Sequence, residues 1–153
     1  MSDLITVTGV VATEPRSITT SEGVSITSFR LASQDRKIDR ATGKWTDGDT
    51  NWYTVTSFRN LAKNVASSVK KGERVIVAGK LRIREWDSGE KQGTNVEIEA
   101  AKMGHDLNWG VASFEKKLPE SMLTEWPSND KNSGGTSTEE TSEEEEEPLR
   151  QTA

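Results

Sequence analysis

Apolar side chains recur at every second position in several short stretches of the first 105 residues. This is the period of a β-strand, in which successive side chains point to opposite faces. The pattern predicts five strands, at residues 4–11, 24–32, 51–58, 74–86 and 95–101. In the second of them the apolar phase slips between Ile26 and Phe29, which predicts a β-bulge at that point. The chain is therefore expected to have an all-β fold.

One segment, residues 59–72, has a helical period instead. Its apolar residues are spaced four apart, at Leu61, Val65 and Val69. Asn60 is a suitable N-cap and Gly72 a suitable residue to end the helix, so one α-helix is predicted here. Three strands, a helix and two further strands follow the order of an oligonucleotide/oligosaccharide-binding (OB) fold, although another small β-barrel can have the same order. The OB fold is a five-stranded barrel with one α-helix between strands three and four.

The end of the chain differs in composition from the rest. Residues 1–117 contain 42 hydrophobic residues and carry a net charge of +3, whereas residues 118–153 contain 6 and carry −8. A segment so poor in apolar residues cannot form a core, and five consecutive glutamates within it favour disorder. We predict an OB domain at residues 1–110, a partly ordered extension at 111–126 and a disordered acidic tail at 127–153.

Several kinds of functional site are not expected, because the residues they need are missing. The chain has no cysteine and one histidine, His105, which disfavours disulfides, thiolate zinc sites and multi-histidine metal sites. It has no phosphate-binding glycine loop and no hydrolase nucleophile motif. We therefore predict a protein that is not an enzyme and uses no metal or other cofactor. No apolar run approaches the length of a membrane span, which indicates a cytoplasmic protein.

The predicted strand at 74–86 has two chemically different faces. One face is apolar and is expected in the core; it consists of Val75, Val77, Gly79, Leu81 and Ile83. The other face carries three cations and an indole, namely Lys80, Arg82, Arg84 and Trp86. Two acids of the next strand, Glu97 and Glu99, also share a face and are expected to be solvated.

The predicted strand at 51–58 carries aromatic residues on its outward side. If Tyr53 and Val55 face the core, then Trp52 and Phe58 face outward. Unpaired nucleic acid explains exposed rings beside cations, since its bases stack on aromatic rings and its phosphates attract lysine and arginine. Duplex bases are already stacked and cannot use the rings. Packing between strands, or an interface between subunits, is the alternative explanation.

The polar segment 34–50 is expected to form a long hairpin loop. It adds five residues to the predicted nucleic-acid site: Arg36, Lys37, Arg40, Lys44 and Trp45. The cations of such a loop are more often only solvated, and the tryptophan can equally pack locally.

With these residues in view, the chain resembles the bacterial single-stranded DNA-binding proteins of the homotetrameric OB-fold type. The matching segments are VTGVVATEP, SFRLAS, DRATG, NWYTVTSFRNLA and KKGERVIVAGKLRIREW, which together lie within residues 3–105. The resemblance implies a homotetramer that binds single-stranded DNA without sequence preference in replication, recombination and repair, at the nucleoid. It places Trp52, Phe58 and Trp86 where the family has base-stacking aromatics. Lys37 stands where the family often has another tryptophan.

The end of the chain departs from the family pattern. The family commonly ends in an acidic tip closed by an apolar Pro-Phe-like end that recruits replication and repair enzymes. Here the glutamates at 143–147 are followed by Pro148 and Leu149, and the chain finishes Arg-Gln-Thr-Ala. The usual recruitment is therefore not expected, which favours an accessory paralogue. The tail can be an inert solubilising segment, a partner-binding segment, or a competitor of DNA for the cations, weakened by salt.

Two other functions stay open at this point. One is an OB-fold protein that binds RNA, because stacking and phosphate contacts do not read a 2′-hydroxyl. The other is a protein-interaction module of the replication or restart machinery, in which the aromatic face buries a protein. The quenching of tryptophan fluorescence by single-stranded DNA, by RNA and by duplex DNA distinguishes these two functions from the binding of single-stranded DNA.

Overall fold

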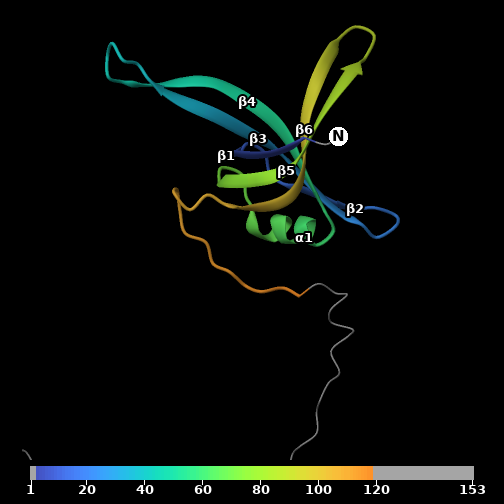
Figure 1. Cartoon of the computed structure of the whole chain (residues 1–153). Helices are drawn as coiled ribbons and strands as arrows, with labels where there is room; N and C mark the ends of the chain where they lie inside the picture. The colour runs from blue at the N-terminus through green and yellow to red at the C-terminus, as the bar shows by residue number, and fades with distance from the viewer. Residues whose placement is uncertain (1–2, 119–153) are drawn as a thin grey trace, which may run out of the picture. The chain divides into compact units, whose positions relative to one another are not determined.

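The computed structural model describes residues 3–118, which form six strands and one helix (Figure 1). In chain order these are β1 (Leu4–Val11), β2 (Arg16–Thr19), β3 (Ser25–Ile38), β4 (Trp45–Phe58), α1 (Arg59–Ser68), β5 (Arg74–Asp87) and β6 (Gln92–His105). The sheet order is β1-β5-β6-β4-β3-β2, and an additional pairing of β1 with β3 closes the barrel. Five long strands with a helix before β5 confirm the predicted OB fold.

The core lies inside this closed sheet. Val11, Leu31 and Val55 are fully buried there, and α1 contributes Ala62 and Val65 at one end of the barrel. Buried side chains at alternate positions of β1, β3, β4, β5 and β6 account for the period of two in the sequence. No helix in residues 3–118 is long and apolar enough to span a membrane. The predicted tail at 127–153 lies outside the described residues, and the predicted boundaries of the OB domain and the extension stay predictions.

Two long hairpins extend beyond the barrel (Figure 1). We call them the β3–β4 arm and the β5–β6 arm. The predicted loop at 34–50 is wrong, because β3 continues to Ile38 and β4 begins at Trp45. In an arm both faces of the strands meet solvent, so the sequence there lacks the alternation that marks a half-buried strand.

The β5–β6 arm explains a second error. Ile83, predicted in the core, is 64% exposed. It lies beyond the point where β5 leaves the barrel, so no opposite wall covers it. The strand predicted at 95–101 extends over 92–105. Residues 92–94 lie in the solvated arm, and at the other end an extra residue, Ala101, shifts the phase of the alternation, so that Met103 packs against the core.

The β-bulge predicted between Ile26 and Phe29 is also wrong. The pairing of β3 with β4 runs unbroken from Ile26 to Gln34. Thr27 occupies the core position that the apolar pattern seemed to skip, and its hydroxyl donates a hydrogen bond to the Ala62 carbonyl at 2.9 Å. A satisfied hydroxyl makes a threonine acceptable there. The register shift lies further along, between Gln34 and Arg36.

Two smaller features differ from the prediction. The helix ends at Ser68 rather than at residue 72, and its N-cap is Phe58, which makes no side-chain capping bond. Gly72 instead lies in the following turn with a φ of 91°. Strand β2 was not predicted, because all four of its residues are exposed and show no apolar alternation.

Candidate nucleic-acid interface

Four neighbouring strands, β5, β6, β4 and β3, present one continuous surface away from the core. Residues paired across a ladder share a face, and the pairs Arg82–Glu97 and Thr54–Glu97 link β5 to β6 and β6 to β4. The neighbours Val55 and Ile98 are fully buried, so the paired residues point outward. We call this surface the outer face; it comprises Arg30, Trp52, Thr54, Thr56, Phe58, Lys80, Arg82, Arg84, Trp86, Glu97 and Glu99.

The three rings singled out in the sequence are all exposed on the outer face. Trp52 is 49% exposed, Phe58 38% and Trp86 43%. Folding alone does not favour leaving three large rings in water. Packing inside the barrel is therefore not their role.

Trp52 has a cationic neighbour that the sequence analysis missed. The guanidinium of Arg30 lies 5.7 Å from the centre of the Trp52 ring and donates a hydrogen bond to the Thr54 hydroxyl at 3.2 Å. The signal was present, since Arg30 stands between Phe29 and Leu31, which are both core residues. Its outward direction follows from that alternation.

Trp86 lies across a glycine of the neighbouring strand. It is paired with Gly93, and a Cβ atom at that glycine would stand 2.6 Å from the indole ring. The indole therefore rests on the backbone of β6, which supports one side of the ring. A hollow of about 440 Å³ opens beside it, between Glu85 and Thr94.

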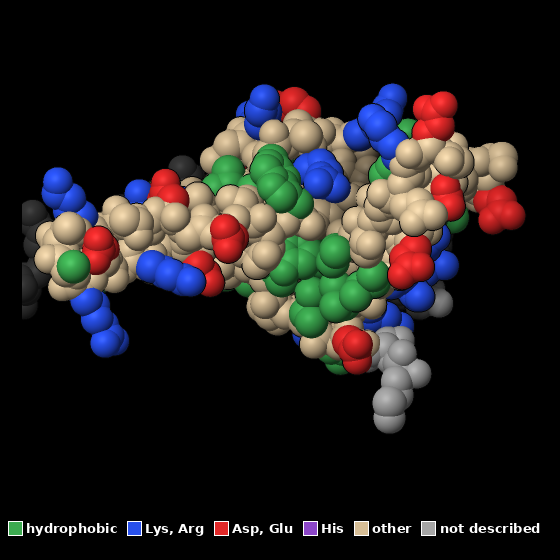
Figure 2. Space-filling view, turned by 90° about the horizontal axis from the view of Figure 1, so that it is seen from above, with side chains coloured by type: hydrophobic (Ala, Val, Ile, Leu, Met, Phe, Trp, Pro, Cys, Tyr) green, Lys and Arg blue, Asp and Glu red, His purple; other side chains and the backbone are tan. Residues whose placement is uncertain are grey.

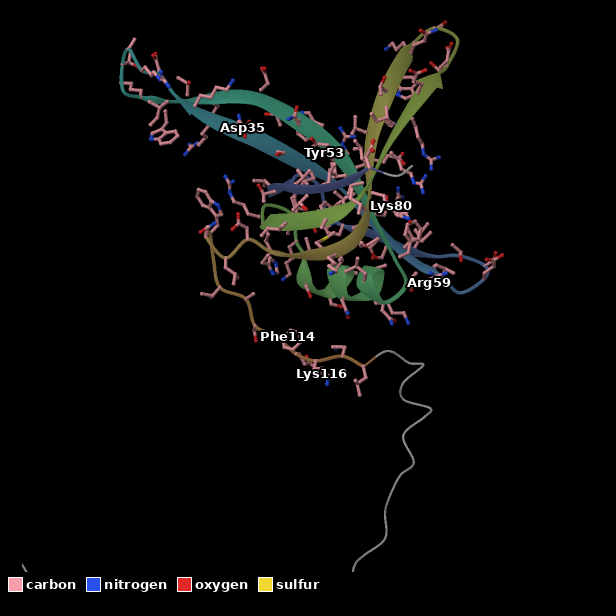
Figure 3. The ribbon with its side chains drawn as sticks, viewed as in Figure 1. Asp35, Tyr53, Arg59, Lys80, Phe114 and Lys116 are labelled. Carbon is pink, nitrogen blue, oxygen red and sulfur yellow. The ribbon has the colours of Figure 1, made fainter. Side chains whose placement is uncertain are left out.

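Phe58 lies near the cation that begins the row on β5. Phe58, Lys80 and Glu99 line one hollow of about 530 Å³, together with Arg59. Figure 3 shows Lys80 near the point where the β5–β6 arm leaves the barrel and Arg59 at the start of α1. Arg59 has a φ of 57°, the left-handed region that non-glycine residues rarely adopt, and this sharp turn ends β4 at Phe58.

Two of the three cations that β5 contributes to the outer face are already paired. Arg82 Nε donates a hydrogen bond to Glu99 at 3.1 Å, and Arg84 Nε forms an ion pair with a carboxylate oxygen of Glu97 at 3.1 Å. Lys80 has no carboxylate within salt-bridge distance among residues 3–118. The sequence places these cations and acids on strand faces, but it does not show that they form ion pairs.

The register shift in the β3–β4 arm determines where Trp45 points. Gly48 and Asp49 of β4 stand opposite the single residue Asp35, which makes a β-bulge. Because of this extra residue, Trp45 is paired with Ile38 and lies on the same side of the ladder as Trp52. Without the bulge the two indoles would point to opposite sides. Trp45 is 63% exposed.

The predicted cations of the β3–β4 arm are spread over both of its sides. Arg36 pairs with Asp47 at 3.5 Å on the side of Trp52, whereas the neighbouring Lys37 points the opposite way. Arg40 and Lys44 lie in the turn that joins the strands. Figure 2 shows basic and acidic side chains interspersed along this arm, at the left.

The one histidine lies at the other end of β6, away from these arms. His105 Nε2 is 2.8 Å from a carboxylate oxygen of Glu73, and this hydrogen bond is the main reason why the pKa of Glu73 is lowered. The guanidinium of Arg74 lies 4.0 Å from the centre of the Trp109 ring. These contacts join the start of β5 to the end of β6 and to the segment after it, which is a packing role.

Known proteins are similar to this chain in sequence and in fold. Residues 3–106 match the sequence model of a protein family that is described as the single-strand binding protein family. A protein of Tropheryma whipplei strain Twist named single-stranded DNA-binding protein 2 is 57% identical over 119 residues, covering 76% of this chain and 78% of the relative.

Two solved structures are similar as well. One is the small single-stranded DNA-binding protein of Streptomyces coelicolor, with a TM-score of 0.66 and 38% identity over 71% of this chain and 98% of that one. The other solved structure is that of the second single-stranded DNA-binding protein (SSBb) of Mycobacterium smegmatis. It has a TM-score of 0.62 and 28% identity, and the match covers 76% of this chain and 100% of that chain.

Proposed function

The chain belongs to the single-strand binding protein family, and we propose that it binds single-stranded DNA without sequence preference. The observation that carries the proposal is the outer face, where three exposed rings lie on the same surface as a row of cations. Stacking on an aromatic ring is worth about 1–3 kcal/mol per base and accepts any base.

In this proposal the rings and the cations have separate tasks. Trp52, Phe58 and Trp86 stack with bases, while phosphates contact Lys80, Arg82 and Arg84. Arg30, which lies against Trp52, joins the phosphate contacts. The β3–β4 arm extends the path with Trp45 and Arg36 on one side and with Arg40 and Lys44 in its turn. A strand that wraps around the arm also meets Lys37 on the opposite side. The chain performs no chemistry on the DNA.

A fluorescence titration tests the proposal. Oligo-dT is added to the protein, and the quenching of its five tryptophans is compared with that caused by oligo-rU and by duplex DNA of the same length. We expect strong quenching by oligo-dT and weak quenching by duplex. Stronger quenching by oligo-rU would indicate an RNA-binding protein. No quenching by any of the three would indicate a protein-interaction module.

We further propose that the protein is a homotetramer and an accessory paralogue that serves DNA replication, recombination or repair at the nucleoid. Exposed apolar side chains on the outside of the barrel, such as Leu4 on β1 and Ile76 on β5, support burial between subunits. The names of the relatives, "protein 2" and "the second", support the accessory role. Sedimentation equilibrium measures the mass in solution, and a monomer would contradict the tetramer.

A further inference from the structure

Two acidic side chains lie in the middle of the outer face. Glu97 and Glu99 belong to β6, which is hydrogen-bonded to β5 on one side and to β4 on the other. They therefore stand between the cations of β5 and the rings of β4. A polyanion that touches both of these strands passes over the two carboxylates.

The two carboxylates already occupy the guanidinium groups that would bind a phosphate. Arg82 and Arg84 each form an ion pair through Nε with one glutamate, at 3.1 Å, and the pair of Arg82 with Glu99 is also a hydrogen bond. Both arginine side chains are at least half exposed, so the ion pairs are weak and a phosphate can replace the carboxylate at low cost. The carboxylate that is left behind remains close to the arginine and repels the incoming phosphate.

We propose that Glu97 and Glu99 compete with phosphate for Arg82 and Arg84, and that they thereby limit the affinity of the outer face for single-stranded DNA. The inference rests on the proposed function. It also predicts a shallow salt dependence. An unpaired arginine that meets a phosphate releases counterions, whereas an arginine that exchanges a carboxylate for a phosphate releases fewer.

The test replaces each glutamate by its neutral isostere. Glu97→Gln and Glu99→Gln are titrated with oligo-dT at a series of NaCl concentrations, and thermal unfolding checks that both variants are folded. We expect each substitution to tighten binding roughly twofold to fivefold at low salt. The slope of log K against log salt should steepen by up to about 0.7 for each arginine that is set free.

Two controls separate local competition from a general effect of charge. Glu22→Gln removes the same charge from the exposed turn between β2 and β3, and it should leave affinity within error. Glu99→Gln is also made in an Arg82→Ala background. There it should give much less gain than in the unmodified protein, because the arginine for which it competes is gone.

The possible outcomes separate this inference from the proposed function. If the unmodified protein binds oligo-dT and the variants bind it no more tightly, the competition is disproved and the proposed function stands. A loss of affinity also disproves it, since the glutamates then position the arginines for DNA. An equal gain in Glu22→Gln reduces the effect to net charge and disproves it as well. Failure of the unmodified protein and of every variant to bind oligo-dT overturns the proposed function and this inference together.

Discussion

A ring that stacks with a base must be exposed before the base arrives. Trp52 and Trp86 meet this condition, and neither contributes to the buried core. We therefore expect Trp52→Ala and Trp86→Ala each to weaken oligo-dT binding by about 1–3 kcal/mol while the thermal midpoint changes little. Isothermal titration calorimetry and circular dichroism measure the two effects.

Trp109→Ala is the matched control for these two substitutions. Its ring is also exposed, but it lies against Arg74 and away from the outer face. The substitution should leave the affinity for oligo-dT unchanged. Loss of folded structure in Trp52→Ala and Trp86→Ala would assign both rings to packing instead of binding.

The support that the Gly93 backbone gives to the Trp86 indole can be tested as well. A methyl group at Gly93 would stand 2.6 Å from the indole, so Gly93→Ala must displace the ring. We expect this variant to lose part or all of the affinity that Trp86→Ala loses, and to add little when the two are combined. Near-ultraviolet circular dichroism reports the movement of the ring in the free protein.

Gly104→Ala provides the comparison for Gly93→Ala. Gly104 lies in the same strand, is exposed, and has open space where the methyl group would go. The Gly104→Ala variant should bind oligo-dT as tightly as the unmodified protein does. If both alanine variants bind normally, Gly93 does not position the indole.

At the scale of elements, the sequence predicts strands well only where the barrel wall buries one face. Residues 4–11 alternate between core and solvent, and the predicted bounds of β1 agree with the structure. The arms are solvated on both faces, so no periodicity marks them, and the sequence predicts a loop at 34–50 where β3 continues to Ile38 and β4 begins at Trp45. The β-bulge at Gly48 and Asp49 cannot be predicted from the sequence of β4 alone, because it depends on the pairing with β3.

The bulge carries a prediction of its own. It turns Trp45 to the side of Trp52, while the neighbouring Thr46 points the opposite way. Exchanging the two, as Trp45→Thr with Thr46→Trp, keeps the composition and moves the indole across the arm. We expect the exchange to weaken oligo-dT binding as much as Trp45→Ala does, by about 1–3 kcal/mol. Normal binding by the exchanged variant would show that the side of the arm does not matter.

The end of the barrel has a pH-dependent contact between elements. Glu73, just before β5, is hydrogen-bonded to His105 at the end of β6 and to the backbone N–H of Lys70 after α1. These contacts lower the pKa of Glu73, so its ionised form stabilises the fold. This contribution is complete above the ordinary pKa of a glutamate and is lost as the pH falls through the lowered value.

Glu73→Gln should therefore be less stable than the unmodified protein at pH 6, by at most about 1 kcal/mol because the pair is partly exposed. The difference should shrink as the pH falls below about 4.5. Urea unfolding at a series of pH values measures it. Glu90→Gln, in the exposed β5–β6 turn, should show no such trend; a difference that grows on acidification would contradict the assignment.

At the scale of the whole molecule, much of the candidate site follows from local pattern. The row on β5 and the rings on β4 were predicted from parity alone, and the structure places them on one face. The pairing of Arg82 with Glu99 and of Arg84 with Glu97 was not predicted. It depends on the register between two strands, and a single sequence does not specify that register.

Charge is divided between two parts of the chain, and this division predicts a salt-dependent effect on binding. Residues 1–117, which form a compact unit, carry a net charge of +3, whereas residues 118–153 carry −8. If the acidic segment competes with DNA for the cations of the outer face, ending the chain after Lys117 should tighten oligo-dT binding at low salt. The gain should fade near 1 M salt, where charges more than about 3 Å apart are screened.

Two comparisons separate this competition from other effects of removing 36 residues. Replacing the five glutamates at 143–147 by glutamine keeps the length, removes five charges and should give part of the same gain. A gain that does not change with salt would indicate an effect of excluded volume, because excluded volume is insensitive to ionic strength whereas attraction between charges is not. Equal affinities at every salt concentration would leave the acidic segment without a part in DNA binding, and the glutamates of β6 would then be the competitors built into the chain.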